Sequence, residues 1–131
     1  MSIDFESLTL TDIIRLQNQL SNSLAQRFEK RLAIIFNDIV GSTAYFQRYG
    51  DQAGRQLHQR HLDLLAANLE GSDGRIVDTA GDGALIAFTR IEDATEFSIR
   101  LHRALWRMHR SALSEHRWQT RTCIHWGPTL T

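Results

Sequence analysis

The amino-acid sequence predicts an α+β fold whose elements follow the order β-α-β-β-α-β, preceded by an N-terminal helix. Three observations support this prediction. Apolar runs of strand length alternate with longer amphipathic segments, glycines separate many of them, and the two middle runs are joined at the short sequence Gly81-Asp82-Gly83. In this order, helices on one face of a four-stranded antiparallel sheet form the ferredoxin-like arrangement.

The N-terminal segment is predicted to form an amphipathic helix between Ser7 and Arg31. Apolar side chains recur there every three to four residues, with polar side chains between them. Thr9 and Thr11 are both candidate N-caps. Three turns of apolar spacing are too few to define a coiled coil, so a helix packed on its own domain and a dimeric stalk are both open interpretations.

The remaining elements follow the alternation of apolar runs, and glycines mark several of their ends. They are a strand at Leu32–Ile39, helices at Ala44–Tyr49 and Gln52–Leu69, a hairpin of Arg75–Val77 with Ala84–Phe88, a helix at Glu92–Arg110 and a strand at Thr120–Trp126. With 42% apolar residues in 131, the chain can bury one core.

Two carboxylates stand beside glycines at predicted strand ends. Asp38 ends an apolar run and precedes Gly41-Ser42-Thr43, where glycine permits a turn and Ser42 or Thr43 can cap a helix whose N–H groups attract anions. Asp82 lies between two glycines at the predicted hairpin tip. Alone, each aspartate could be an ordinary capping or turn residue. Together they have the layout of a two-metal nucleotide site.

Three ordered motifs resemble the catalytic domain of class III nucleotidyl cyclases, the adenylyl and guanylyl cyclase family. The motifs are Phe36-x-Asp38-Ile39-x-Gly41-Ser42-Thr43, then Gly81-Asp82-Gly83 before a strand ending in Phe88, and Arg121-Thr122-Cys123-Ile124-His125-Trp126-Gly127-Pro128. The resemblance implies that residues 31–131 are the N-terminal two thirds of such a domain. Residues 1–30 would then be a linker or signalling helix.

The resemblance also implies a metal site and a reaction. Asp38, Asp82 and the backbone carbonyl of Ile39 would bind two Mg²⁺ or Mn²⁺ ions, and Gly41, Ser42 and Thr43 would bind the β- and γ-phosphates. Two divalent ions offset the charge that develops when the 3′-hydroxyl of ATP or GTP attacks the α-phosphorus. The implied products are a 3′,5′-cyclic nucleotide and pyrophosphate, which makes the protein a lyase of signal transduction.

Asp78 is the position that the resemblance connects with the purine base, four residues before Asp82. Adenylyl cyclases usually have lysine there and guanylyl cyclases tend to have glutamate, so a carboxylate favours GTP slightly. The asparagine and arginine that act on the ribose and the transition state from the other subunit of a homodimer would lie after Thr131. The chain alone is therefore expected to be inactive, and a non-catalytic regulatory or dimerisation module is the alternative function.

Composition limits the partners and the location. The 15 basic and 15 acidic residues balance and the basic ones are dispersed, so no nucleic-acid partner is expected. No apolar run approaches membrane length, no signal pattern begins the chain, and Cys123 is a single cysteine, so a cytoplasmic location without membrane contact is expected. His58 and His61 lack further ligands at metal-binding spacing and are predicted on a solvated helix face.

Overall fold

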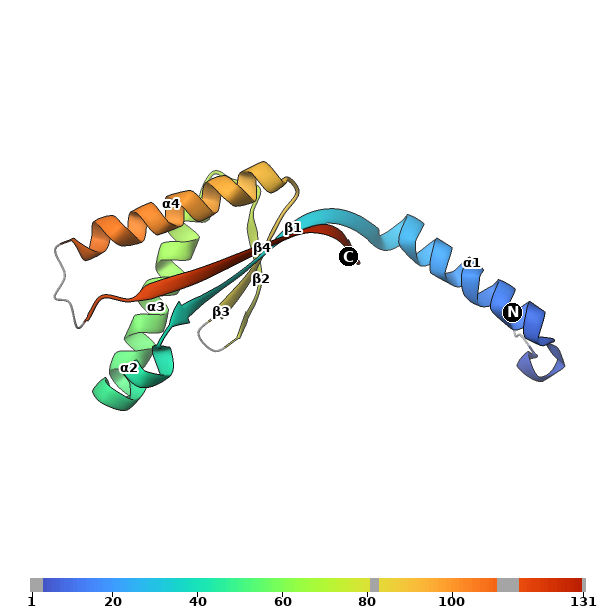
Figure 1. Cartoon of the computed structure of the whole chain (residues 1–131), viewed down its shortest axis with the longest axis horizontal. Coiled ribbons are helices and arrows are strands. Elements are labelled where there is room, and N and C mark those ends of the chain that lie inside the picture. The colour runs from blue at the N-terminus through green and yellow to red at the C-terminus, as the bar shows by residue number, and fades with distance from the viewer. Residues whose placement is uncertain (1–3, 81–82, 111–115, 131) are drawn as a thin grey trace. The chain divides into compact units, whose positions relative to one another are not determined.

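The computed structural model describes residues 4–80, 83–110 and 116–130 (Figure 1). Its elements are η1 (Phe5–Ser7), α1 (Leu10–Phe28), β1 (Glu29–Val40), α2 (Ser42–Tyr49), α3 (Asp51–Leu69), β2 (Arg75–Ala80), β3 (Gly83–Phe88), α4 (Ile91–His109) and β4 (Gln119–Leu130). The chain divides into two compact units, one of residues 32–127 and one of residues 1–31 with 128–131. Among the described residues, no helix is both long enough and apolar enough to cross a membrane.

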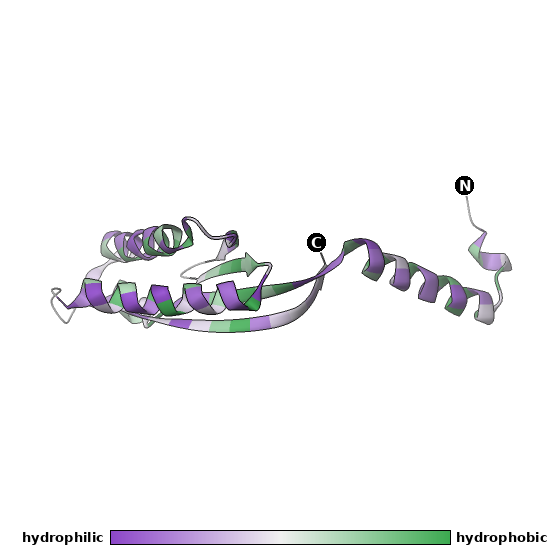
Figure 2. Cartoon of the chain, turned by 90° about the horizontal axis from the view of Figure 1, so that it is seen from above, coloured by the Kyte–Doolittle hydropathy of each residue, from purple (hydrophilic) through white to green (hydrophobic). Residues whose placement is uncertain are grey.

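Helix α1 begins after one of the two predicted N-cap residues, Thr9. Thr9 is the N-cap, since its Oγ1 accepts a hydrogen bond from the Asp12 amide at 3.2 Å while Asp12 Oδ2 accepts from the Thr9 amide at 3.1 Å. Apolar residues alternate with polar ones along the helix in Figure 2, and none of its side chains is buried. The helix is shorter than predicted, because residues 29–31 belong to β1.

The four strands form one sheet in the order β2-β3-β1-β4. Strand β1 is antiparallel to β3, with Ala33 opposite Phe88 and Asp38 opposite Gly83. Strand β2 is also antiparallel to β3, and Ala80 lies opposite Gly83. This order confirms the predicted ferredoxin-like arrangement, in which the first and third strands are central neighbours.

One face of the sheet packs against α3 and α4. Along β1, Ala33, Ile35 and Ile39 are buried, whereas Phe36 between them is 59% exposed, as expected when successive side chains point to opposite faces. The core of the larger unit combines residues of these two helices and the two central strands with Trp118: Ala33, Ile35, Ile39, Leu57, Leu64, Leu65, Ala84, Ile86, Phe88, Ala94, Phe97, Leu101, Leu105 and Trp118.

A buried polar group lies inside this core, and it corrects one prediction. His61 is 2% exposed rather than on a solvated face, because it belongs to the buried side of α3 together with Leu57 and Leu64. Its Nδ1 accepts from Trp118 Nε1 at 3.1 Å, and its Nε2 lies 2.6 Å from Asn37 Oδ1. The neutral imidazole can therefore satisfy both partners, which makes its burial tolerable.

A second histidine, His109, packs its ring edge-on against Trp118 with the centroids 4.4 Å apart. Its Nε2 accepts a hydrogen bond from the Trp118 amide at 3.2 Å. Burial lowers the pKa of His109 below its ordinary value of 6.5, and the charges of Arg117 and Arg60 lower the pKa further, against an opposing contribution from the Trp118 amide. The imidazole is therefore neutral at neutral pH.

This lowered pKa predicts a pH-dependent stability. Between the lowered value and 6.5 the unfolded chain binds a proton that the folded chain does not, so the free energy of unfolding should fall as the pH falls through this window. His109→Gln keeps an acceptor but cannot titrate. Urea unfolding at several pH values between about 7.5 and 5 should show a steeper loss for the wild type than for the variant. Parallel curves would rule out a contribution from His109.

Candidate functional site

Asp38 lies near the end of β1 on the face that the helices leave open, with 38% of its side chain exposed. Arg121 on β4 binds both of its carboxylate oxygens: Nε donates to Oδ1 at 3.1 Å and Nη2 donates to Oδ2 at 2.9 Å. The backbone carbonyl of Asp38 accepts from Thr120 Oγ1 at 2.9 Å. Strand β4 therefore orients Asp38 through both its main chain and its side chain.

The second predicted metal ligand, Asp82, lies outside the described residues, together with Gly81. The neighbouring Gly83 is described, and it lies opposite Asp38 on one side and Ala80 on the other. The register of the sheet thus brings the residue next to Asp82 directly across from Asp38. The sequence separation of these two positions is large, and only the pairing of β1 with β3 joins them.

The turn after β1 has the geometry that glycine allows. Gly41 has φ of 75°, in the left-handed region that other residues rarely adopt, and it is the N-cap of α2. Ser42 or Thr43 was predicted to cap this helix, and this is wrong, because α2 begins at Ser42 and has no side-chain cap. The amide of Tyr45 makes the first helical hydrogen bond, to the Gly41 carbonyl at 3.1 Å. The preceding amides form a helix start of the kind that attracts anions.

A cavity of about 650 Å³ opens beside Asp38, a size suited to a small molecule. It combines carboxylates, one guanidinium and apolar side chains, and its lining residues are Phe36, Asn37, Asp38, Asp78, Gly83, Ala84, Leu85, Arg121, Thr122 and Cys123. Asp78, the predicted base-selecting residue, follows a register irregularity in the β2–β3 pairing, and its Oδ1 accepts from the Thr79 amide at 2.8 Å. Asp38 and Asp78 therefore border the same cavity.

Two carboxylates, those of Asp38 and Asp78, line this cavity. Carboxylate oxygens are the ligands that Mg²⁺ and Mn²⁺ prefer. Ile39, whose carbonyl was predicted as a ligand, buries its side chain in the core. Within the described part of the chain, no three His, Cys, Asp or Glu residues gather into a group that could hold a metal ion, and Asp82 falls outside that search. An ion at Asp38 would compete with Arg121 for the carboxylate oxygens.

Arg121 begins the third sequence motif, but its ion pair with Asp38 was not predicted from the sequence. Its partner is 83 positions away in the chain. Only the pairing of β4 with β1 brings the two together. The ferredoxin-like order places the first and last strands side by side, and this adjacency could have indicated that residues of β1 and β4 meet.

Comparisons with known proteins give one curated relative and many solved structures. No protein-family model matches the chain. The serine/threonine-protein kinase pkn2 of Myxococcus xanthus is 26% identical over 101 residues, which cover 77% of this chain and 12% of that protein. The chain thus spans a small part of this relative.

The similar solved structures include three cyclases. A bacterial light-regulated adenylyl cyclase is 16% identical, with a TM-score of 0.71 over 76% of this chain and 55% of that one. The guanylyl cyclase Cya2 is 16% identical, with a TM-score of 0.67 over 76% of this chain and 55% of that one. An adenylate/guanylate cyclase/hydrolase from Silicibacter pomeroyi is 22% identical, with a TM-score of 0.65 over 76% of this chain and 58% of that one.

These likenesses show the fold. The chain has the fold of the adenylyl and guanylyl cyclase catalytic domains, as the sequence motifs led us to expect, and it spans a little over half the length of the solved chains. At these identities a shared activity does not follow from the shared fold.

Proposed function

We propose that the chain is part of a purine nucleotide cyclase domain that forms a 3′,5′-cyclic nucleotide and pyrophosphate from GTP or ATP in cytoplasmic signal transduction. The observation that carries this proposal is the β1–β3 register, in which Asp38 lies opposite Gly83, the neighbour of Asp82. Asp38 borders a cavity of nucleotide size, and a second carboxylate at the residue before Gly83 would suit two-metal phosphoryl chemistry.

Asp38, Asp82 and the Ile39 carbonyl would hold two Mg²⁺ or Mn²⁺ ions, which when bound would neutralise charge on the triphosphate and the attacking hydroxyl. The amides that follow Gly41 would donate to phosphate oxygens at the start of α2. Arg121 borders the same cavity and keeps the Asp38 carboxylate oriented. Of these groups, Asp38 and Arg121 come from neighbouring strands, and the amides come from the turn that follows β1.

The open face of the sheet also supports the proposed homodimer. Two large apolar side chains of β1, Phe36 and Val40, are exposed on it, since they alternate with the buried Ile35 and Ile39. Exposed apolar side chains on a sheet face suit burial by a second copy. A non-catalytic regulatory or dimerisation module is the second candidate, and the bidentate Arg121–Asp38 pair favours it, because the pair neutralises a metal ligand.

Asp78 provides the test of function and of base choice. In a polypeptide that extends through a whole cyclase domain, we expect cyclic nucleotide formation with about tenfold to a hundredfold preference for GTP, since a carboxylate accepts from guanine N1–H and N2–H. Asp78→Lys should shift kcat/KM toward ATP, because an ammonium donates to adenine N1 but meets a donor at guanine N1. Asp63→Lys, at an exposed position on α3, is the matched control.

The two parts of the proposal fail differently in this assay. Absence of cyclic nucleotide from both triphosphates with Mg²⁺ and with Mn²⁺ would contradict the cyclase function. A wild type that strongly prefers ATP, with no change in Asp78→Lys, would leave the cyclase function standing and remove Asp78 from the base site.

A further inference from the structure

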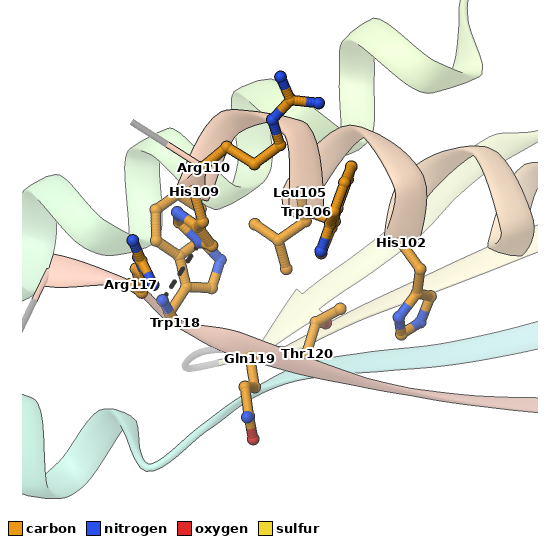
Figure 3. A pocket seen from close by; sticks show the side chains of 9 residues that line it. All are labelled: His102, Leu105, Trp106, His109, Arg110, Arg117, Trp118, Gln119 and Thr120. Atoms are coloured by element: carbon orange, nitrogen blue, oxygen red, sulfur yellow. Dashed lines mark hydrogen bonds between the residues drawn. The ribbon is translucent and has the colours of Figure 1, made fainter. Parts of the chain in front are cut away.

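A second cavity, of about 470 Å³, lies between the last turns of α4 and the start of β4 (Figure 3). It shares no lining residue with the cavity beside Asp38. Its walls are His102, Leu105, Trp106, His109, Arg110, Arg117, Trp118, Gln119 and Thr120. The volume suits a small organic molecule, and apart from Thr120, which bonds the Asp38 carbonyl, these residues belong neither to the sequence motifs nor to the proposed cyclase reaction.

The cavity offers an open aromatic surface. Trp106 on α4 is 64% exposed, although it is among the most apolar and costly side chains to leave in water. The Arg110 guanidinium lies over its ring, 5.2 Å from the centroid. Trp118 forms the opposite, buried part of the wall. A planar ring entering the cavity would gain stacking contacts with Trp106 that water does not provide.

The charged side chains among the described residues around the cavity are positive. Arg110 and Arg117 line it, and the Arg60 guanidinium lies 5.7 Å from the ring centroid of Trp118. The described lining contains no aspartate or glutamate. Cations gathered at a partly apolar, partly enclosed surface raise the local concentration of anions and pair with carboxylates in a bidentate manner. The cavity therefore favours an acidic ligand.

His109 contributes a hydrogen-bond donor that has no partner among the residues the structure describes. Because its Nε2 accepts from the Trp118 amide, the proton of the neutral ring lies on Nδ1. Nδ1 is buried and makes no hydrogen bond to any described residue. A buried donor without an acceptor is costly, and a ligand oxygen beside His109 would remove that cost.

Hydrogen bonds to the core fix the floor of the cavity. Trp118 Nε1 donates to His61 at 3.1 Å, and Thr120 Oγ1 donates to the Asp38 carbonyl at 2.9 Å. His102 Nε2 lies 3.0 Å from Thr122 Oγ1. A site whose walls are already held in place loses little conformational entropy when a ligand binds.

We propose that this cavity binds a small planar aromatic acid, with its ring against Trp106 and its carboxylate beside Arg110 and His109. Both chemical requirements, aromatic and anionic, come from the same few side chains at one end of α4. The proposal does not depend on the cyclase function, and its test needs neither metal nor nucleotide.

The test uses 1-naphthoate as the probe and isothermal calorimetry with the chain as it stands. Two matched probes separate the requirements: naphthalene-1-methanol keeps the ring without the charge, and cyclohexanecarboxylate keeps the charge without the aromatic ring. We expect 1-naphthoate to bind at least about tenfold more tightly than either. Trp106→Ala and Arg110→Gln should each weaken its binding about tenfold, whereas Arg103→Gln, exposed on α4 outside the cavity, should not.

The substituted side chains are exposed, so circular dichroism and thermal unfolding should be the same in all variants. Equal affinity for the acid and the alcohol would overturn the anionic requirement. Binding of 1-naphthoate that survives both Trp106→Ala and Arg110→Gln would show that the acid binds elsewhere. Absence of binding by 1-naphthoate up to about 5 mM would overturn the site itself.

Discussion

Asp38→Ala should lower cyclic nucleotide formation by about a thousandfold or more in a polypeptide that extends through the whole domain. The alanine removes one of the two carboxylates proposed to hold the metal ions, and the other cannot bind both. Arg121 loses its ion pair with Asp38, but with 71% of its side chain exposed this costs little in folding. The measurement is kcat/KM with Mn²⁺ and GTP.

Two controls make this result specific. Asp63→Ala removes an exposed carboxylate from α3 and should leave kcat/KM unchanged. Arg121→Gln breaks the same ion pair but keeps the Asp38 carboxylate, so it shows how much of the loss comes from the pair alone. If Asp38→Ala stays within about tenfold of the wild type, the carboxylate is not a ligand of an essential metal ion.

His61→Ala should lower the free energy of unfolding by about 3 kcal/mol. The substitution leaves Trp118 Nε1 and Asn37 Oδ1 without their buried partner, and it opens a cavity under α3. Urea unfolding, followed by tryptophan fluorescence, measures the change.

His58→Ala is the matched control, since it removes the same side chain one turn earlier on α3 from a half-buried position. Its ring contacts the edge of Phe46, with the centroids 5.0 Å apart, so a loss of about 1 kcal/mol is expected. Equal losses for the two variants would mean that the polar contacts of His61 add nothing to stability.

The order of elements could be predicted from the sequence because it depends on local patterns. The spacing of apolar residues, together with glycines at the ends of elements, was sufficient to identify each strand of the sheet and each helix that follows it. The errors are at the ends of the strands: β2 continues through Asp78 and Thr79 to Ala80, and β4 continues beyond Trp126 through Gly127 and Pro128 to Leu130. Backbone hydrogen bonds to a neighbouring strand do not depend on the side chains, so the pattern of apolar residues does not show how far each strand continues.

The candidate site was predictable only in part. Asp38 and the turn at Gly41 belong to one local motif, and the structure shows the motif at a strand end beside a cavity. The Arg121–Asp38 pair and the burial of His61 depend on contacts between distant segments. For His61 a polar side chain suggested solvent, but the helix phase that it shares with Leu57 and Leu64 decides its burial.

The central claim, that Asp38 and Asp82 together bind divalent metal, is tested most directly by calorimetry of Mn²⁺ with a non-hydrolysable triphosphate. The wild-type chain should bind with a dissociation constant of about 0.1–1 mM, equivalent to about 4–5 kcal/mol. Asp38→Asn and Asp82→Asn should each abolish measurable binding, whereas Arg121→Gln leaves both carboxylates in place and should still bind Mn²⁺. Equal binding by the wild type and both aspartate variants would contradict the metal site.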